Sequence, residues 1–105
     1  MNARLGFTTL ALGLSFAAVP QAFANQELAK AKNCLACHAL ERKVVGPAYQ
    51  DVAKKYAGDP DAQARLAAKI VKGGVGVWGP VPMPANTQVS DAQANQLAAW
   101  VLSLK

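Results

Sequence analysis

The segment Cys34-Leu35-Ala36-Cys37-His38 constrains the fold of this chain more than any other feature. It holds both cysteines and the only histidine among 105 residues, at the spacing C-x-x-C-H. Two thiols and one imidazole are therefore kept together on a few residues, whatever surrounds them. These residue types in this pattern indicate redox chemistry, metal binding or covalent attachment of a cofactor.

Three interpretations of the motif leave part of it unexplained. A thioredoxin-like redox pair has the same C-x-x-C spacing but needs a βαβ setting, and no segment of this chain alternates like a strand. A structural zinc site needs four ligands, whereas the chain offers only two cysteines and one histidine. A disulfide between Cys34 and Cys37 would close so short a loop that it constrains little of the chain.

Covalent attachment of a c-type haem uses every residue of the motif. The thiols of Cys34 and Cys37 can add to the two vinyl groups of one porphyrin and form thioether bonds. The imidazole of His38 is then held over the ring face, where it can ligate iron. We therefore predict one covalently bound haem c with its iron, with a disulfide or a thiol-redox pair as the alternative.

Residues 1–24 have the pattern of an export signal. Arg4 provides a positive start, and the run from Leu5 to Val19 is uncharged and mostly apolar. This run is shorter than the roughly 20 residues that span a bilayer, and Ala22-Phe23-Ala24 is a small-x-small pattern that signal peptidase cleaves after. We expect cleavage after Ala24 and a soluble domain of residues 25–105 in the bacterial periplasm, without stable membrane insertion; an uncleaved anchor is the alternative.

The charge pattern does not resemble that of a nucleic-acid-binding protein. The formal net charge is +5, and it falls to +4 when Arg4 leaves with the leader. The lysines are scattered, without a basic run or interleaved aromatic side chains. We expect no nucleic acid partner, although a positive surface could steer docking onto an acidic protein.

Four segments show the apolar spacing of helices, which predicts a single all-α domain of about four short helices. The last segment begins at Ser90, three residues before Gln93, as in a capping box. The third has Asp59 as a cap and Pro60 at its first position. The segments run from about Gln26 to Asn33, from Tyr49 to Tyr56, from Asp59 to Gly73 and from Ser90 to Leu104.

The connection from Gly73 to Val89 is rich in glycine and proline, a composition that we expect to exclude a long helix or a central strand. A long structureless connection in so small a domain is usually functional. It contains Met83, the only methionine of the predicted mature chain, between Pro82 and Pro84. A methionine opposite a histidine can fill the sixth position of a haem iron and raise its reduction potential. We predict Met83 as that ligand; a core-filling methionine is the alternative.

Three further side chains are candidates for contacts with the cofactor. The indole N–H of Trp78 and the ammonium of Lys69 are donors that could satisfy haem propionates. Ordinary core packing for Trp78 and an exposed helix face for Lys69 are the alternatives. Asn86 could donate a hydrogen bond to the sulfur of Met83, or it could simply form a turn.

The chain from Cys34 to Lys105 resembles the small class I cytochromes c of the bacterial c-551/c-552 type. Four segments carry the resemblance: Cys34-Leu35-Ala36-Cys37-His38, Val45-Gly46-Pro47-Ala48-Tyr49, Gly76-Val77-Trp78-Gly79-Pro80-Val81-Pro82-Met83-Pro84 and Trp100-Val101-Leu102-Ser103. The resemblance implies a monohaem domain in which short helices wrap around the haem and the N- and C-terminal helices cross. It also implies that the carbonyl of Pro47 accepts a hydrogen bond from His38. The loop after Met83 is about one residue longer than in the best-known members.

The function that the resemblance implies is a monomeric periplasmic one-electron carrier rather than an enzyme. The implied partners are a membrane cytochrome complex as donor and a nitrite reductase or terminal oxidase as acceptor. The alternative functions are a haem-based sensor, a small-molecule binder or a weak peroxidase with an open sixth site.

The composition of the predicted mature chain points to a small core. Apart from alanine and the two cysteines, residues 25–105 contain only 22 apolar side chains, and domains of this size have marginal cores. We expect the haem to supply the missing apolar bulk and the chain without haem to be largely unfolded.

Overall fold

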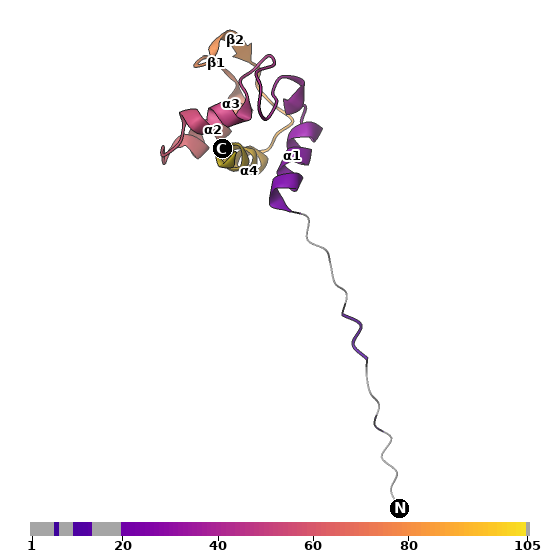
Figure 1. Cartoon of the computed structure of the whole chain (residues 1–105). Coiled ribbons are helices and arrows are strands. Elements are labelled where there is room, and N and C mark those ends of the chain that lie inside the picture. Colours follow the sequence, from indigo (N-terminus) through magenta and orange to yellow (C-terminus); the bar gives the residue numbers. More distant parts are fainter. Residues whose placement is uncertain (1–5, 7–9, 14–19, 105) are drawn as a thin grey trace, which may run out of the picture.

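The computed structural model describes residue 6, residues 10–13 and residues 20–104 (Figure 1). Most of the predicted export signal therefore lies outside the described residues. Within the described part of the chain, no helix is both long enough and apolar enough to cross a membrane. The domain that follows consists of four α-helices, one short 3-10 helix and one hairpin.

All four predicted helices are present, with different starting points for two of them. The bounds are α1 Gln21–Ala31, the 3-10 helix η1 Cys34–Ala36, α2 Tyr49–Lys55, α3 Ala62–Lys72 and α4 Asp91–Ser103. Helix α1 begins before the predicted Gln26. Helix α3 begins after the predicted Asp59-Pro60, because Oδ1 of Asp59 accepts a hydrogen bond from the backbone N–H of Asp61 (2.9 Å) and holds a turn there.

The capping box predicted for α4 is confirmed. The hydroxyl of Ser90 accepts from the backbone N–H of Gln93, and the Gln93 side chain accepts from the backbone N–H of Ser90, both at 3.1 Å. This reciprocal pair fixes the direction in which α4 leaves the preceding loop.

The connection between α3 and α4 was predicted to lack structure, and this is wrong in part. It contains an antiparallel hairpin of β1 Gly74–Gly76 and β2 Gly79–Met83, which is neither a long helix nor a central strand, and the fold is mainly helical as predicted. Gly76 and Gly79 have φ angles of 104° and 114°, which let the chain reverse within a few residues. In a sheet of two strands each strand is an edge, and edge strands tolerate proline.

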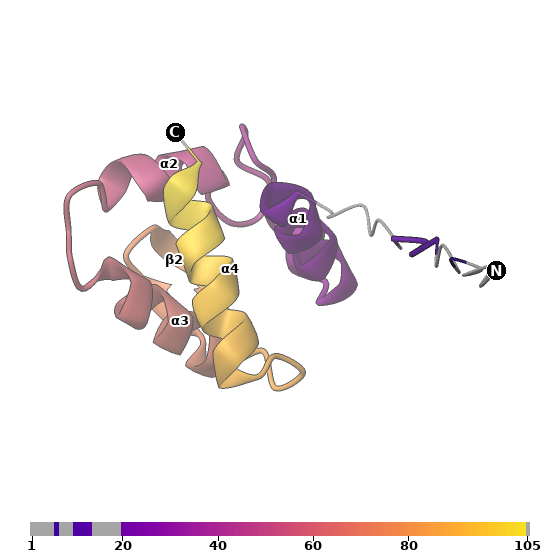
Figure 2. The same ribbon diagram turned by 90° about the horizontal axis from the view of Figure 1, so that it is seen from below.

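Helix α4 is the centre of the packing, with α1 on one side and α2 and α3 on the other (Figure 2). Its residues Leu97, Trp100 and Val101 are buried. The side-chain amide of Gln96 donates to Oδ1 of the buried Asn25 (2.7 Å), which ties α1 to α4. More than half of the buried hydrophobic residues in the described chain are alanines, so the protein part of the core is thin.

Asn33 lies just before η1 and has a φ of 64°, a left-handed conformation that most side chains disfavour. We expect Asn33→Ala to lower the free energy of unfolding by about 1–2 kcal/mol, and Asn33→Gly to leave it unchanged or raise it. Denaturant unfolding of the holoprotein measures both. Ala68→Gly, at an exposed position in the middle of α3, is the control and should lose about 0.5–1 kcal/mol. A loss of stability in Asn33→Gly would contradict the conformational argument.

Candidate haem site

The two cysteines lie at the start of a tight fold of the backbone. The backbone N–H groups of Cys37 and His38 both donate to the carbonyl of Cys34 (3.2 and 3.0 Å). The carbonyl of Cys37 in turn accepts from the N–H groups of Val45 and Gly46 (3.1 and 2.8 Å). Both cysteines are half-buried and are not joined by a disulfide. The chain between η1 and α2 therefore loops out and returns directly against the motif.

The imidazole of His38 is held on two sides by this returning chain. Its Nδ1 lies 2.8 Å from the carbonyl oxygen of Pro47, and since a carbonyl can only accept, Nδ1 carries the proton. Gly46 packs so closely that a Cβ there would lie 2.6 Å from Cε1 of His38. The free nitrogen, Nε2, is the one that remains available to a metal.

A third neighbour of His38 was missed by the sequence analysis. The ring of Tyr49 stacks on the imidazole, with centroids 4.9 Å apart and an interplanar angle of 21°. Burial raises the pKa of the Tyr49 phenol, and the nearby Cys34 thiol adds to the increase. Burial likewise raises the pKa of the Cys34 thiol, opposed in part by the phenol. The apolar spacing of the α2 segment indicated that Tyr49 would be buried, but not what its ring would contact.

An apolar pocket opens beside His38, with about 890 Å³ of empty space, part of it open solvent. Six of the predicted site residues line it: Cys37, His38, Pro47, Lys69, Trp78 and Met83. Val75, Val77 and Val81 also line it, although they are among the exposed large hydrophobic residues. Pockets that bind cofactors are mostly apolar with a few polar groups, and exposed apolar surface of this kind marks a binding site. These residues fit a flat, largely apolar group that carries a metal.

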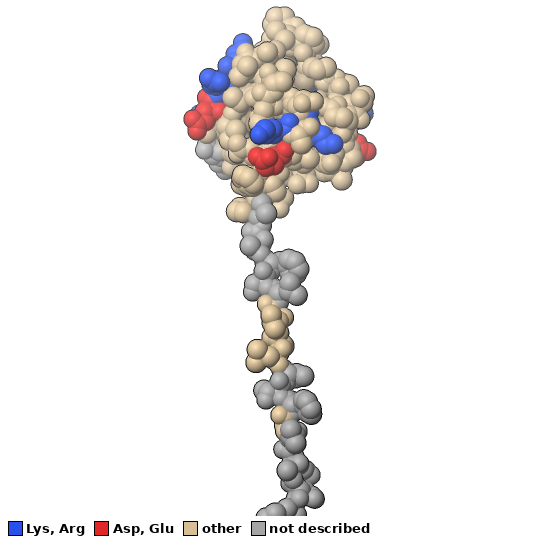
Figure 3. Space-filling view, turned by 90° about the vertical axis from the view of Figure 1, so that its right-hand side faces the viewer, with Lys and Arg blue, Asp and Glu red and all other residues tan. Residues whose placement is uncertain are grey.

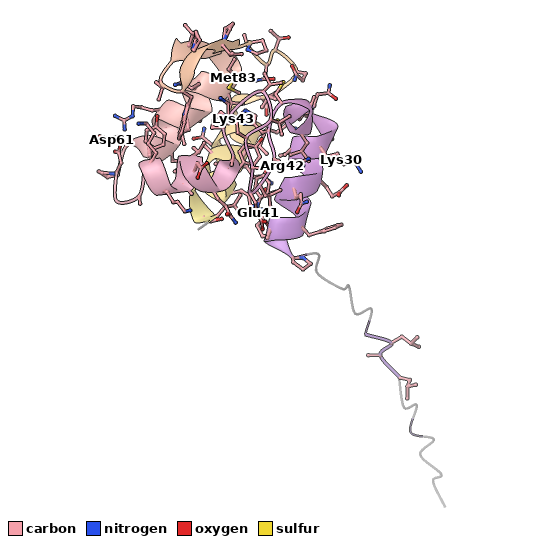
Figure 4. All side chains as sticks on the ribbon, turned by 45° about the horizontal axis from the view of Figure 1, so that its top comes forward. Lys30, Glu41, Arg42, Lys43, Asp61 and Met83 are labelled. Atoms are coloured by element: carbon pink, nitrogen blue, oxygen red, sulfur yellow. The ribbon has the colours of Figure 1, made fainter. Side chains whose placement is uncertain are left out.

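In Figure 4, Arg42 and Lys43 mark the loop between η1 and α2. Met83, the last residue of β2, lines the pocket from the hairpin side of the domain. Its side chain is half-buried. Pocket-lining residues thus come from the motif, the start of α2, the end of α3 and the hairpin. Distant parts of the sequence meet around one space.

Trp78 and Lys69 lie at this pocket, but their predicted contacts with propionates stay predictions. The Trp78 side chain is 40% exposed, and Nζ of Lys55 lies 5.5 Å from the centroid of one of its rings. The stem of Lys69 lies along Gly74, where a Cβ would come within 3.2 Å of Cε. Both side chains are therefore within the reach of solvent and of a ligand in the pocket.

Asn86 makes contacts that the sequence analysis did not anticipate. Its side-chain Nδ2 and its backbone N–H both donate to the carbonyl of Ile70 at the end of α3 (2.8 and 3.2 Å). Its Oδ1 accepts from Gln88 (3.2 Å), whose amide also donates to the carbonyl of Lys32 (3.0 Å). The residue thus joins the loop after Met83 to α3, and its donation to the sulfur of Met83 stays a prediction.

Comparison with known proteins gives the family. Residues 24–105 match the Cytochrome c family. The chain is 65% identical to cytochrome c-552 of Hydrogenobacter thermophilus over 79% of this chain and 84% of that protein. It is 59% identical to cytochrome c-551 of Pseudomonas aeruginosa over 74% of each. The crystal structure of Nitrosomonas europaea cytochrome c552 superimposes with a TM-score of 0.75 at 57% identity. The match covers 76% of this chain and 99% of the chain in that structure. The chain therefore belongs to the cytochrome c family: it is a small class I c-type cytochrome, with a covalently attached haem c.

Proposed function

We propose that this cytochrome is a one-electron carrier in which His38 and Met83 are the axial ligands of the haem iron. Cys34 and Cys37 hold the haem through thioether bonds. The observation that supports this most directly is that His38 and Met83 line the same apolar pocket from different elements. The bound haem supplies the reversible change between Fe(II) and Fe(III). With both axial positions filled by side chains, the iron has no open position for a substrate, and the protein is not an enzyme.

His38 is prepared for this role by Pro47. Ligating histidines almost always donate their second ring N–H to an oxygen, which fixes the tautomer and raises the basicity of the ligand. The 2.8 Å contact between Nδ1 and the Pro47 carbonyl has this form, and it leaves Nε2 as the ligand atom.

Met83 is held through its backbone. Gly73, at the end of α3, has a φ of 75° and lies so close to β2 that a Cβ there would come 2.5 Å from the carbonyl oxygen of Met83. Pro82 and Pro84 restrict the chain on both sides of the methionine. The thioether is therefore carried by a stiff segment that packs against a helix end.

The location and the partners belong to the same proposal. Residues 1–24 are a signal peptide cleaved after Ala24, and the mature domain, residues 25–105, is a soluble monomer in the periplasm. Helix α1 begins at Gln21, so cleavage after Ala24 removes its first turn. Asn25 remains, with its hydrogen bond to Gln96. The donor is a membrane cytochrome complex, and the acceptor is a nitrite reductase or a terminal oxidase.

The surface agrees with brief contacts between redox proteins. On the face shown in Figure 3, a few small groups of basic and acidic side chains lie next to one another, and most of the surface is uncharged. The apolar rim of Val75, Val77 and Val81 around the pocket offers a small contact area. Weak redox encounters have small interfaces.

The central experiment is the visible spectrum of the oxidised protein before and after Met83→Ala. We expect the wild type to show the methionine–iron charge-transfer band and a low-spin iron. The variant should lose the band, become high-spin and have a lower reduction potential, because a thioether ligand raises the potential. Val81→Ala, on the same strand, is the matched control and should keep the band. A high-spin wild type without the band would instead support the open-site sensor or peroxidase.

The close approach of Gly46 to His38 gives a second prediction. We expect Gly46→Ala to cost about 1–3 kcal/mol of unfolding free energy through overpacking, and to alter the spectrum because the imidazole has to move. Gly58→Ala is the control: it has a φ of 78° and no atom near its Cβ position, so it should lose stability without a spectral change. Wild-type stability and spectrum in Gly46→Ala would contradict the packing at His38.

A third prediction concerns the dependence of folding on the haem. A Cys34→Ala/Cys37→Ala variant made without haem should be largely unfolded, because the pocket walls would have nothing to pack on. Far-UV circular dichroism measures the helix content, with the wild-type holoprotein as reference. A helical spectrum close to that of the holoprotein would show that the thin core is sufficient by itself.

A further inference from the structure

The stack between Tyr49 and His38 involves a residue that is not among the proposed ligands of the haem. Tyr49 is the first residue of α2, and its side chain is only 7% exposed. Its ring lies face to face with the imidazole, 4.9 Å between centroids and 21° from parallel. Offset aromatic stacking at this separation is attractive and depends on orientation.

The tyrosine ring has little freedom to turn away from this position. On another side it meets the ring of the buried Trp100 in an edge-on arrangement, with centroids 5.6 Å apart and planes at 75°. Its backbone N–H donates to the carbonyl of Ala39 (2.9 Å), which follows His38 directly. The ring is thus fixed between the haem-binding motif and α4.

The other contacts of His38 leave one motion uncontrolled. The hydrogen bond from Nδ1 to Pro47 fixes one edge of the imidazole, but a single bond permits rotation of the ring plane about the N···O line. Gly46 lies against the ring at Cε1 and limits how far that edge moves. A flat partner on the ring face is what resists the remaining rotation, and Tyr49 is that partner.

We propose that Tyr49 is a positioning residue that sets the plane of the His38 imidazole and so the orientation of the axial ligand over the haem. This inference rests on the proposed role of His38 as a ligand. Through the contact with Trp100, the ligand plane is also coupled to the packing of α4.

The test compares the oxidised holoproteins of wild type, Tyr49→Phe and Tyr49→Leu by proton NMR. In a low-spin ferric haem, the spread and order of the four ring-methyl shifts depend on the orientation of the axial ligand planes. Tyr49→Phe keeps the stacked ring and should preserve the wild-type order. Tyr49→Leu removes the ring and should change the order or the spread. Unchanged shifts in Tyr49→Leu would overturn the proposal.

Two additions separate positioning from stability. Tyr56→Leu, at the other end of α2 and without a stack on His38, should lower the melting temperature and leave the methyl shifts unchanged. If Tyr49→Leu does not yield holoprotein, Tyr49→Met, which fills the space with a flexible chain, is judged by the same criterion. In the reduced wild type, nuclear Overhauser contacts between the rings of Tyr49 and His38 should be present, and their absence would also overturn the proposal.

The failure of this inference differs from the failure of the proposed function. The methionine–iron band of the oxidised wild type tests the axial ligands. A wild type that shows the band, together with Tyr49→Leu shifts identical to wild type, refutes the positioning role alone. A wild type without the band refutes the His/Met carrier itself.

Discussion

The two hydrogen bonds that the carbonyl of Cys37 accepts from Val45 and Gly46 close the loop on which the rest of the site depends. They bring Gly46-Pro47 against His38, which orients the imidazole, and at the start of α2 the backbone N–H of Tyr49 then donates to the carbonyl of Ala39. Because α2 begins at Tyr49, the same closure delivers the aromatic ring to the imidazole. Backbone geometry in a short segment thus determines the direction of the imidazole that we propose as an iron ligand.

The thin core leads us to expect a structural as well as a redox role for the haem. Alanines dominate the buried positions, so the helices approach closely but bury little apolar area. The larger apolar side chains Val75, Val77 and Val81 instead face the pocket. A bound haem completes the packing between the hairpin, α3 and the motif. We therefore expect cofactor binding and folding to be coupled, as they are in small domains that depend on metals.

Local signals in the sequence were sufficient to predict the four helices, apart from the starts of α1 and α3, and to predict Cys37, His38, Lys69, Trp78 and Met83 around the pocket; Pro47 was predicted from the resemblance alone. The periodic spacing, the capping box at Ser90 and the position of Met83 between prolines depend on neighbours in the chain. The hairpin was missed because its strands are short and rich in glycine and proline, which mask the alternation of a strand. The hydrogen bond of Asn86 to Ile70 and the stack of Tyr49 depend on distant segments that meet only in the folded chain. No pattern within a few residues encodes such contacts.

The hairpin also has an edge that faces away from the domain, and its chemistry limits association. In β2, which pairs with β1 at Gly79 and Met83 across an irregular register, Pro80 and Pro82 occupy two of the positions between these residues. Proline has no N–H to donate, and β2 therefore lacks two of the donors that a further strand would use. A strand from a second copy would find fewer donors there, which is one of the ways in which proteins protect exposed edges. The prolines that stiffen the methionine segment thereby also keep the hairpin from growing into a larger sheet.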